Sequence, residues 1–295
     1  MGHHYVPRFL LRQWLSGDES DKQLLGHYWD RYSGNMRIRR RGENFFCNRA
    51  NLFTVRGLPD GDDAIERLFF KKVDDQGALA YRKVLDGSPL SIEDRTRFIT
   101  FVLSLEARRP AAVEYVKSRA STFITEKVNS DPDIRRVLDE AGITRSAAEV
   151  WEEYEGFSIA DQAMETVQKL SINQRVGGAL LRASWGTFRV QPDCDDLVLG
   201  DRPLIRFGEL FSPQNIWVLP LTPKAAWFCA LDPRTYRSIG LMQPRKFAAW
   251  INTSAALTSD KYVFCQRPPT TTWLEKRLKA RDTQLADGSS LPYNV

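Results

Sequence analysis

Helical patterning runs almost unbroken through the middle of this chain, over residues 62–186, and separates two strand-rich regions. Residues 1–58 are extended and rich in turns, and residues 187–265 alternate short apolar segments with Pro, Gly and Asp. Strands, then helices, then strands are typical of an α+β fold. We therefore predict one α+β domain over residues 1–265, with a mostly helical middle and a small mixed or antiparallel sheet built from the N- and C-terminal regions. A basic helix and a loose polar tail are expected over residues 266–295.

Local signals predict where several elements lie. Pro7 has the φ angle of a first helical turn and no amide hydrogen to satisfy, so it predicts a short helix after it. Ser91 and Asp94 form a variant of the capping box, which predicts the start of the helix that contains RFITFVLSLEARRP. The segment from Ser33 to Asn35 predicts a β-hairpin turn, and ANLFTV predicts a further short strand.

The positive charge of the chain is concentrated near its N-terminal end. Residues 1–56 contain ten Lys or Arg against five Asp or Glu, which accounts for the whole net charge of +5. All three histidines, His3, His4 and His27, lie in the same stretch. A polyanion such as nucleic acid would therefore meet this region first. The alternative is a solvated basic hairpin that has no partner.

Other features narrow the class of protein. No apolar run reaches the roughly 18 residues of a membrane-spanning helix, and the N-terminus lacks a signal-peptide pattern. The four cysteines are too far apart to form a zinc-binding pair, and they indicate no disulfide framework. We therefore expect a reduced, cytoplasmic protein without a membrane partner. The sequence does not predict its oligomeric state.

Two charged residues interrupt an apolar helical stripe. At helical spacing, Glu106 and Arg109 fall among Phe98, Val102 and Leu105. A buried charge must be paired or hydrogen-bonded, because an isolated one costs several kcal/mol or more. Glu106 and Arg109 therefore predict a structural salt bridge, an exposed helix end at Pro110, or groups that face a cleft shared with the N-terminal segment.

The segment HHYVPR offers candidate catalytic groups. Imidazole can act as a general base, a metal ligand or a phosphate hydrogen-bond donor near neutral pH. Neighbouring side chains of an extended segment point to opposite sides, so only one of His3 and His4 can face a given site. Asp201 is a further candidate because it directly follows the apolar strand LVLG, where a sheet would hold a ligand or base rigidly. The alternative for Asp201 is the chemistry of a tight turn.

The chain resembles a bacterial family of unknown function whose members open with a His-Tyr-Val-Pro motif. The resemblance lies in HHYVPRFLLRQW, ENFFCNRANLFTV, DAIERLFFKKVDDQGALAYRKV, LEARRP, LVLGDRPLI, WVLPLTPKAAWF and INTSAALTSDKYVF. Either Arg108 or Arg109 matches the arginine of the family's helix end. The recurring polar positions that the resemblance implies are His3 or His4, Tyr5, Arg8, Glu66, Glu106, Arg109, Asp201 and Asn252.

A second similarity concerns nucleases with a metal-bound His-Asn-His core. HHYVP and ENFFCNRAN resemble its two halves, but about 40 residues separate them and no third histidine follows Asn48. Our hypothesis is therefore a nucleic-acid-processing enzyme whose catalytic residues are arranged differently from that core. It would be a nuclease of bacterial defence or conflict, with a divalent metal as a candidate cofactor. Its catalytic groups would be His3 or His4 with Glu106 and Asp201, and its substrate-binding groups Tyr5, Arg8, Arg39, Arg109 and Asn252. The alternative is a non-catalytic module that binds a ligand or a partner.

Overall fold

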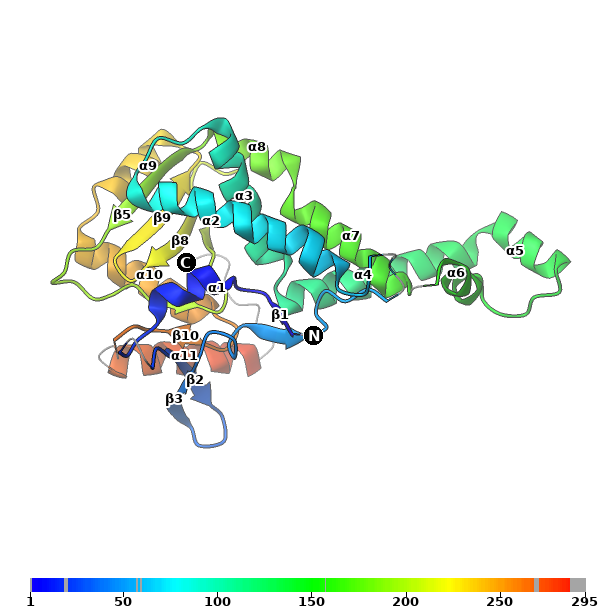
Figure 1. Cartoon of the computed structure of the whole chain (residues 1–295), viewed down its shortest axis with the longest axis horizontal. Coiled ribbons are helices and arrows are strands. Elements are labelled where there is room, and N and C mark those ends of the chain that lie inside the picture. Colours follow the sequence, from blue (N-terminus) through cyan, green and yellow to red (C-terminus); the bar gives the residue numbers. More distant parts are fainter. Residues whose placement is uncertain are drawn as a thin grey trace.

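Figure 1 shows the computed structural model of the chain, which describes residues 2–18, 21–56, 58, 60–156, 158–267 and 271–286. Helices and small antiparallel sheets share the molecule, which confirms the predicted α+β class. The predicted loose tail falls on residues 287–295, which lie outside the described residues. No helix in the described part of the chain combines the length and the apolar content that a membrane crossing requires.

The N-terminal region begins with a short strand and a tight helical segment. Strand β1 (Gly2–His4) pairs with β4 (Asn48–Ala50), and Pro7 precedes α1 (Arg8–Leu11) and the 3₁₀ turn η1 (Arg12–Trp14). This confirms the helix predicted after Pro7. Trp14 is fully buried and donates its indole N–H to the Leu197 carbonyl at 2.8 Å. The opening segment is therefore fastened to the C-terminal region.

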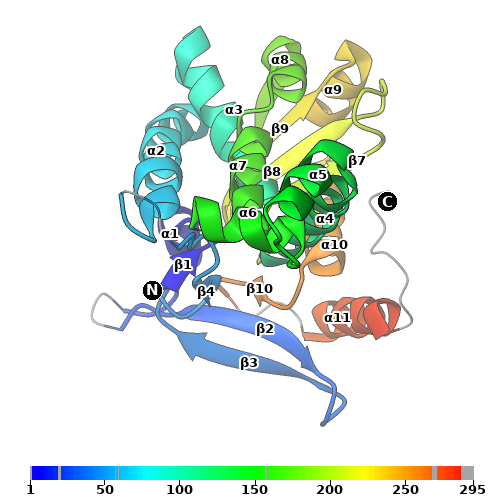
Figure 2. The same ribbon diagram turned by 90° about the vertical axis from the view of Figure 1, so that its right-hand side faces the viewer.

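A hairpin and two short distant strands form the first sheet. Strands β2 (Leu24–Asp30) and β3 (Asn35–Arg41) pair in antiparallel register, with Gly34 in the left-handed region at φ 65°, which confirms the predicted turn. The sheet order is β3-β2-β10-β6, with β6 at Leu199–Gly200 and β10 at Val263–Phe264. The N- and C-terminal regions thus share one sheet, as predicted. Figure 2 shows the hairpin extending below the body.

The second sheet belongs to the C-terminal region alone. Its order is β5-β9-β8-β7, formed by Ser184–Arg189, Ala225–Ala230, Ile216–Thr222 and Ile205–Phe207. Trp217 and Leu219 of β8 pack on the core beneath α2 and α3, whereas Val218 packs on the core beneath α10. Because both faces are covered, this strand is apolar throughout rather than alternating. Three further helices complete the region: α9 (Pro233–Gly240), α10 (Pro244–Thr258) and α11 (Thr271–Ala286).

The helical middle forms one wall of the body and an arm. The wall contains the π-helical turn η2 (Ile65–Phe70), α2 (Lys71–Asp86), α3 (Ile92–Ala107), α7 (Ile159–Ser171) and α8 (Gln174–Arg182). Helix α3 has the predicted cap, because Ser91 Oγ accepts from the Asp94 amide and the Asp94 carboxylate accepts from the Ser91 amide. The arm in Figure 1 contains α4 (Pro110–Ser130), α5 (Pro132–Glu140) and α6 (Ala147–Glu155).

Two segments differ from the predictions: a predicted strand is mostly a loop, and one helix was not predicted. The segment predicted as a strand, residues 50–55, turns instead directly after Ala50, with Asn51 at φ 55°, and sends Phe53 and Val55 into the core. The apolar pattern there reflects burial of a loop and not strand pairing. Helix α9 lies where no helix was predicted, although Asp232 and Pro233 are its cap and first residue.

Candidate functional site

Two adjacent arginines mark the point where α3 ends and α4 begins. Arg108 and Arg109 are both buried, with 0% and 8% of their surface exposed. Arg108 is the C-cap residue of α3 and Arg109 is the N-cap residue of α4. Because the backbone changes direction here, the two side chains enter different polar groups of residues. The uncertainty over which arginine matches the family pattern therefore concerns two separate places in the structure.

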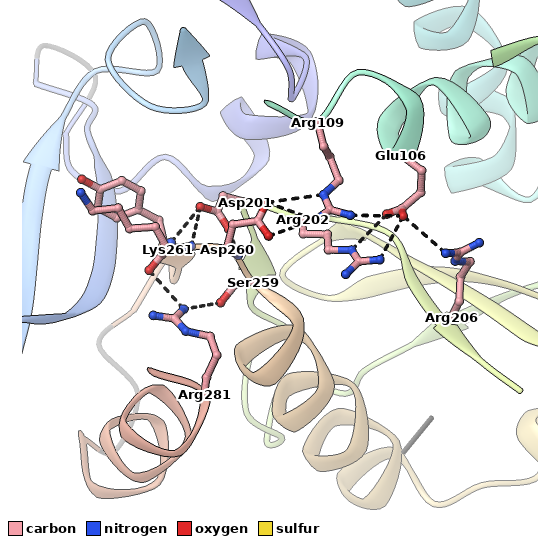
Figure 3. Close-up of polar contacts among 10 residues, drawn as sticks. Glu106, Arg109, Asp201, Arg202, Arg206, Ser259, Asp260, Lys261 and Arg281 are labelled. Carbon is pink, nitrogen blue, oxygen red and sulfur yellow. Dashed lines mark hydrogen bonds and ion pairs between the residues drawn. The ribbon is translucent and has the colours of Figure 1, made fainter. Parts of the chain in front are cut away.

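The first group of residues, the Arg109 network, consists of Glu106, Arg109, Arg202, Arg206 and Asp260 (Figure 3). Arg202 donates to both oxygens of Glu106, through Nε at 3.3 Å and Nη2 at 3.0 Å. Arg109 Nη1 and Arg206 Nη2 each lie 3.5 Å from Glu106 Oε2. Arg109 also contacts Asp260, with 3.0 Å between Nη2 and Oδ1. The expected Glu106–Arg109 pair is present, within a larger set of ions.

Asp201 lies beside this network and caps the loop before β10. Its two carboxylate oxygens accept the amide hydrogens of Asp260 at 2.8 Å and of Lys261 and Tyr262 at 2.9 Å (Figure 3). Arg281 of α11 supports the same loop by donating to Ser259 Oγ at 2.6 Å and to the Lys261 carbonyl at 3.2 Å. The turn alternative considered for Asp201 therefore has direct geometric support.

The pKa values of the two buried carboxyls of this region, Glu106 and Asp201, are shifted in opposite directions. Burial raises the pKa of Glu106, but Arg202, Arg109 and Arg206 outweigh it and leave that pKa lowered. Burial, followed by the charge of Asp260, raises the pKa of Asp201 to about 6 against its backbone hydrogen bonds. Glu106 is therefore held as an anion by its ion pairs, which makes it a poor proton donor or acceptor.

The second group of residues, the Arg108 cluster, consists of His4, Glu66, Asp74 and Arg108. Arg108 Nη1 lies 2.9 Å from Asp74 Oδ1. The Arg108 guanidinium also lies against the Phe70 ring, at 5.7 Å from its centroid. The positive charge of Arg108 lowers the pKa of both Glu66 and His4, and Arg108 also pairs with Asp74. This guanidinium therefore interacts electrostatically with each of the other three residues.

The Arg108 cluster contains buried polar atoms that have no hydrogen-bond partner in the described structure. They are His4 Nε2, Glu66 Oε2, Asp74 Oδ1, and Nε, Nη1 and Nη2 of Arg108. Arg108 and Asp74 still stabilise each other as an ion pair, with 2.9 Å between Nη1 and Oδ1. Leaving a buried donor or acceptor unpaired costs about 1–3 kcal/mol, and more for a charged group. The cluster therefore carries a buried polar cost that its own hydrogen bonds do not offset.

The protonation states in the cluster suit proton transfer. Burial raises the pKa of Glu66 to about 7, with Arg108 opposing that effect and Asp74 adding to it. Burial and then the positive charge of Arg8 lower the pKa of His4, against the effect of Glu43. Near neutral pH, His4 is therefore an unprotonated base, while Glu66 divides between its acid and its anion. Such perturbed pairs are typical of acid–base sites.

His3 points to the other side of the strand from His4, as expected for neighbours in β1. Its Nδ1 accepts the Phe53 amide hydrogen at 2.9 Å, and its ring stacks on Phe53 with 5.4 Å between centroids. Burial lowers the pKa of His3. Because Nδ1 is an acceptor, the proton is on Nε2, which is buried without a partner. The fixed tautomer and full burial give His3 a structural position against the Phe53 loop.

The remaining predicted site residues lie in several places. Asn252 donates to the Asp196 carbonyl at 2.9 Å and accepts the Val198 amide hydrogen at 2.9 Å, which ties α10 to the segment that leads into β6. Tyr5 lies beside Cys47, and burial raises the pKa of its hydroxyl, with smaller effects from Cys47 and Asp201. Arg8 is exposed and pairs with Glu43 at 3.0 Å. Of these three, Arg8 is exposed, Tyr5 is partly buried and Asn252 is buried.

Arg39 belongs to a basic–aromatic face of the hairpin, formed by Tyr28, Arg37, Arg39, Arg41 and Phe45. The Arg39 guanidinium lies 5.7 Å from the Tyr28 ring centroid and 5.5 Å from that of Phe45. Arg41 lies 5.8 Å from the Phe45 centroid, and Phe45 itself is 47% exposed. Interleaved arginines and open aromatic rings are typical of surfaces that bind single-stranded nucleic acid.

Sequence reasoning missed Asp74, although a usable signal was present. Asp74 lies at helical spacing from Gly77 and Tyr81, on the buried stripe of α2, just as Glu106 lies on that of α3. Glu66 entered only through the family resemblance, because nothing in the local pattern of a π-helical turn distinguishes it. Across the described residues, no group of three or more His, Cys, Asp or Glu has the arrangement of a metal site.

Comparison with known proteins places the chain in a family. The model of a family described as "Protein of unknown function (DUF4238)" matches residues 2–269. The chain belongs to this family. The match includes both arginine groups and the basic–aromatic face, so all of them lie within the DUF4238 region. Comparisons with curated proteins and with solved structures gave no match.

Proposed function

We propose that this DUF4238 protein is a nucleic-acid-processing enzyme that hydrolyses phosphodiester bonds, with His4 as general base. The observation that carries the proposal is the continuity between the basic hairpin and the His4 environment. Strand β3 ends at Arg41, and Glu43, two residues later, pairs with Arg8 and Arg12 at 3.0 and 3.2 Å. Arg8 and Glu43 both act on the His4 imidazole. A nucleic-acid strand bound along the hairpin would therefore approach His4, which is partly buried, whereas His3 is fully buried.

The basic–aromatic face supplies the binding surface in this proposal. Arginines neutralise backbone phosphates, and exposed rings stack on unpaired bases, at about 1–3 kcal/mol for each base. Phe45 and Tyr28 are already covered on one side by arginine, which orders them before binding. Tyr32, at the hairpin turn, is fully exposed. The face can therefore hold a single strand without reading its sequence.

Glu106 and Asp201 take supporting roles in the proposed enzyme. The Glu106 oxygens accept from arginines, and both oxygens of Asp201 accept backbone amides. Neither carboxylate is presented for proton transfer, so we assign them to the stability of the junction between α3, β6 and β10. Arg109 holds the same junction through Asp260.

The test is a cleavage assay with the purified chain. Plasmid DNA, single-stranded DNA and total RNA are incubated with Mg²⁺, Mn²⁺ or a chelator, beside the His4→Ala and His4→Gln variants. The proposal expects cleavage by the wild type and its loss in both variants, with unchanged thermal unfolding of His4→Gln. Cleavage that both variants retain would remove His4 from the mechanism.

The second candidate is a module that binds without turnover. The observation that favours it is the saturation of Glu106 and Asp201, which leaves two expected catalytic groups engaged in structure. In that case nucleic acid would bind to the hairpin in a salt-sensitive way and remain intact under every condition. Retained binding with no cleavage of any substrate would decide for this candidate.

A further inference from the structure

We propose that the outer edge of strand β3 is a docking site for an acidic, extended segment of a partner protein, which adds to the first sheet as a further strand. This goes beyond the proposed hydrolysis and does not depend on it. Three observations support the docking site. They are an open backbone edge, a row of arginines on one face of that edge, and an exposed apolar side chain on the other face.

Strand β3 is the outer strand of the first sheet and is paired on one side only. In the sheet order β3-β2-β10-β6, all seven of its residues pair with β2 in one continuous register. Among the residues that the structure describes, no strand pairs with its other side, and Figure 2 shows β3 at the lower margin of the molecule. In an antiparallel strand, alternate residues direct their N–H and C=O groups away from the paired neighbour. A row of open backbone donors and acceptors therefore runs along this edge.

This edge is long for an outer strand. The outer strands β6 and β7 have two and three residues, and the six-residue β5 lies against the end of α2, where Thr187 Oγ1 donates to the Val84 carbonyl at 2.9 Å. Strand β3 has seven residues, five of them exposed, and its register with β2 contains no bulge. It extends about 24 Å at the usual rise of a strand. Proteins commonly shorten, bulge or cover such an edge, because it otherwise pairs with another chain.

Arginines line one face of the edge. Side chains alternate along a strand, so Arg37, Arg39 and Arg41 project to the same face, beside Tyr28 and Phe45. A second copy of β3 does not fit here, because antiparallel pairing about a two-fold axis would set arginine against arginine. Opposite charges at facing positions stabilise a pair of strands. The complement of this edge is therefore a strand that carries acidic residues on the arginine face.

The opposite face of β3 adds an apolar requirement. Met36 and Ile38 project to this face, where Met36 packs with Trp29 against a core that includes Leu274 and Leu278 of α11. Ile38 is 44% exposed. A strand added beside β3 would cover Ile38 with its own apolar side chains and extend this core. The partner segment therefore alternates acidic and apolar residues over about seven positions, the length of β3.

Backbone pairing distinguishes a protein partner from nucleic acid at this edge. A nucleic-acid strand engages guanidiniums and aromatic rings, but it carries no row of N–H and C=O groups at the spacing of a β-strand. A polypeptide in extended conformation carries that row and can pair with the edge. Because its acids would occupy Arg37, Arg39 and Arg41, such a segment would exclude single-stranded nucleic acid from the basic–aromatic face.

The experiment measures the binding of labelled seven-residue peptides to the full chain by fluorescence anisotropy. The first peptide alternates glutamate and valine, and its control has the same residues with the glutamates grouped at the two ends. Both peptides carry the same charge, so attraction by charge alone gives them equal affinities. We expect the alternating peptide to bind about tenfold more tightly, because the control loses several facing pairs. Equal affinities would overturn the docking site.

N-methylation of the alternating peptide tests the backbone pairing itself. In an added strand, one alternate set of amides points to β3 and the other set points to solvent. One peptide is methylated on its three valines and another on three of its glutamates. We expect one of them to bind as the unmodified peptide does and the other about tenfold more weakly, since it loses hydrogen bonds to β3. Equal affinities of the two methylated peptides would overturn strand addition and leave a patch that attracts polyanions.

Charge reversal tests the assigned face. Arg39→Glu should weaken binding of the alternating peptide about tenfold, since the facing charges turn from attraction to repulsion. The matched control is Arg136→Glu at an exposed position of α5, which should bind the peptide as the wild type does. Unchanged affinity of Arg39→Glu would overturn the assignment of the arginine face. None of these measurements uses cleavage, so their outcome is separate from that of the proposed hydrolysis.

Discussion

Arg108 and Arg109 are neighbours in sequence and are both buried, yet they occupy opposite kinds of polar environment. The Arg109 network is saturated: Glu106 has three guanidinium partners and Asp260 adds a second carboxylate. In the Arg108 cluster, the guanidinium has one ion pair and no hydrogen bond within the described structure. The difference teaches that burial of charge alone does not mark a functional site. The two groups differ in how much buried polar capacity the fold leaves without a hydrogen bond.

The two environments should respond differently to substitution. A saturated network contributes to stability, and breaking it leaves new unpaired charges. The open cluster already carries part of that cost in the free protein, so removing an unpaired carboxyl such as Glu66 should destabilise less than removing Arg108, the cation of the buried Asp74 carboxylate. The predictions below test this contrast, beginning with the largest effect.

Asp201→Ala should give the largest loss of stability. Three backbone amides, those of Asp260, Lys261 and Tyr262, would lose a charged acceptor inside the protein. We expect the free energy of unfolding to fall by about 3 kcal/mol or more, measured by urea denaturation. Asp201→Asn should lose less, because its carbonyl oxygen retains acceptor capacity. A loss below about 1 kcal/mol for Asp201→Ala would contradict the structural role.

The matched pair Arg108→Met and Arg109→Met tests the ion pair that each arginine makes. Arg109→Met should lower the free energy of unfolding by about 1–3 kcal/mol, since Asp260 loses its partner, and leave the cleavage rate of folded protein unchanged. Arg108→Met should also lower the free energy of unfolding, by about 1–3 kcal/mol, because the buried Asp74 carboxylate loses its cation even though methionine keeps the packing on Phe70. A loss well below about 1 kcal/mol for either variant would contradict the structural role of the ion pair that the arginine makes.

Sequence patterns predicted the architecture better than the site. The helical middle, the Ser91 cap and the hairpin follow from periodicity and turn chemistry, which act within a few residues. The partners of Arg108 and Arg109 depend on how α2, α3 and the β10 loop meet, and no local rule contains that information. The stripe analysis correctly found buried charge at Glu106. It could not show that this carboxylate would be saturated while the one at Glu66 would stay open.

The pH dependence of stability should differ between wild type and Glu66→Gln. The pKa of Glu66 is raised from 4.5 to about 7 on folding. Its stabilising contribution is therefore complete below pH 4.5 and is lost as the pH rises through about 7. Since glutamine does not titrate, the variant should gain on the order of 2 kcal/mol relative to wild type between these limits. Thermal melts of both proteins across this range measure the difference, and parallel curves would contradict an open, protonated Glu66.

The smallest effect should come from the basic–aromatic face, which delivers substrate but takes no part in either arginine group. Arg39→Ala should weaken binding of single-stranded RNA and reduce the slope of log K against log salt by about 0.7, the value for one phosphate contact. Arg136→Ala on α5 is the matched control, because this arginine is exposed and lies on the arm. At saturating RNA the cleavage rate of Arg39→Ala should equal that of wild type, since the proposed general base, His4, is unchanged. A fall in that saturated rate would mean that the hairpin and the cluster act as one site, which would end the separation between binding surface and chemical centre.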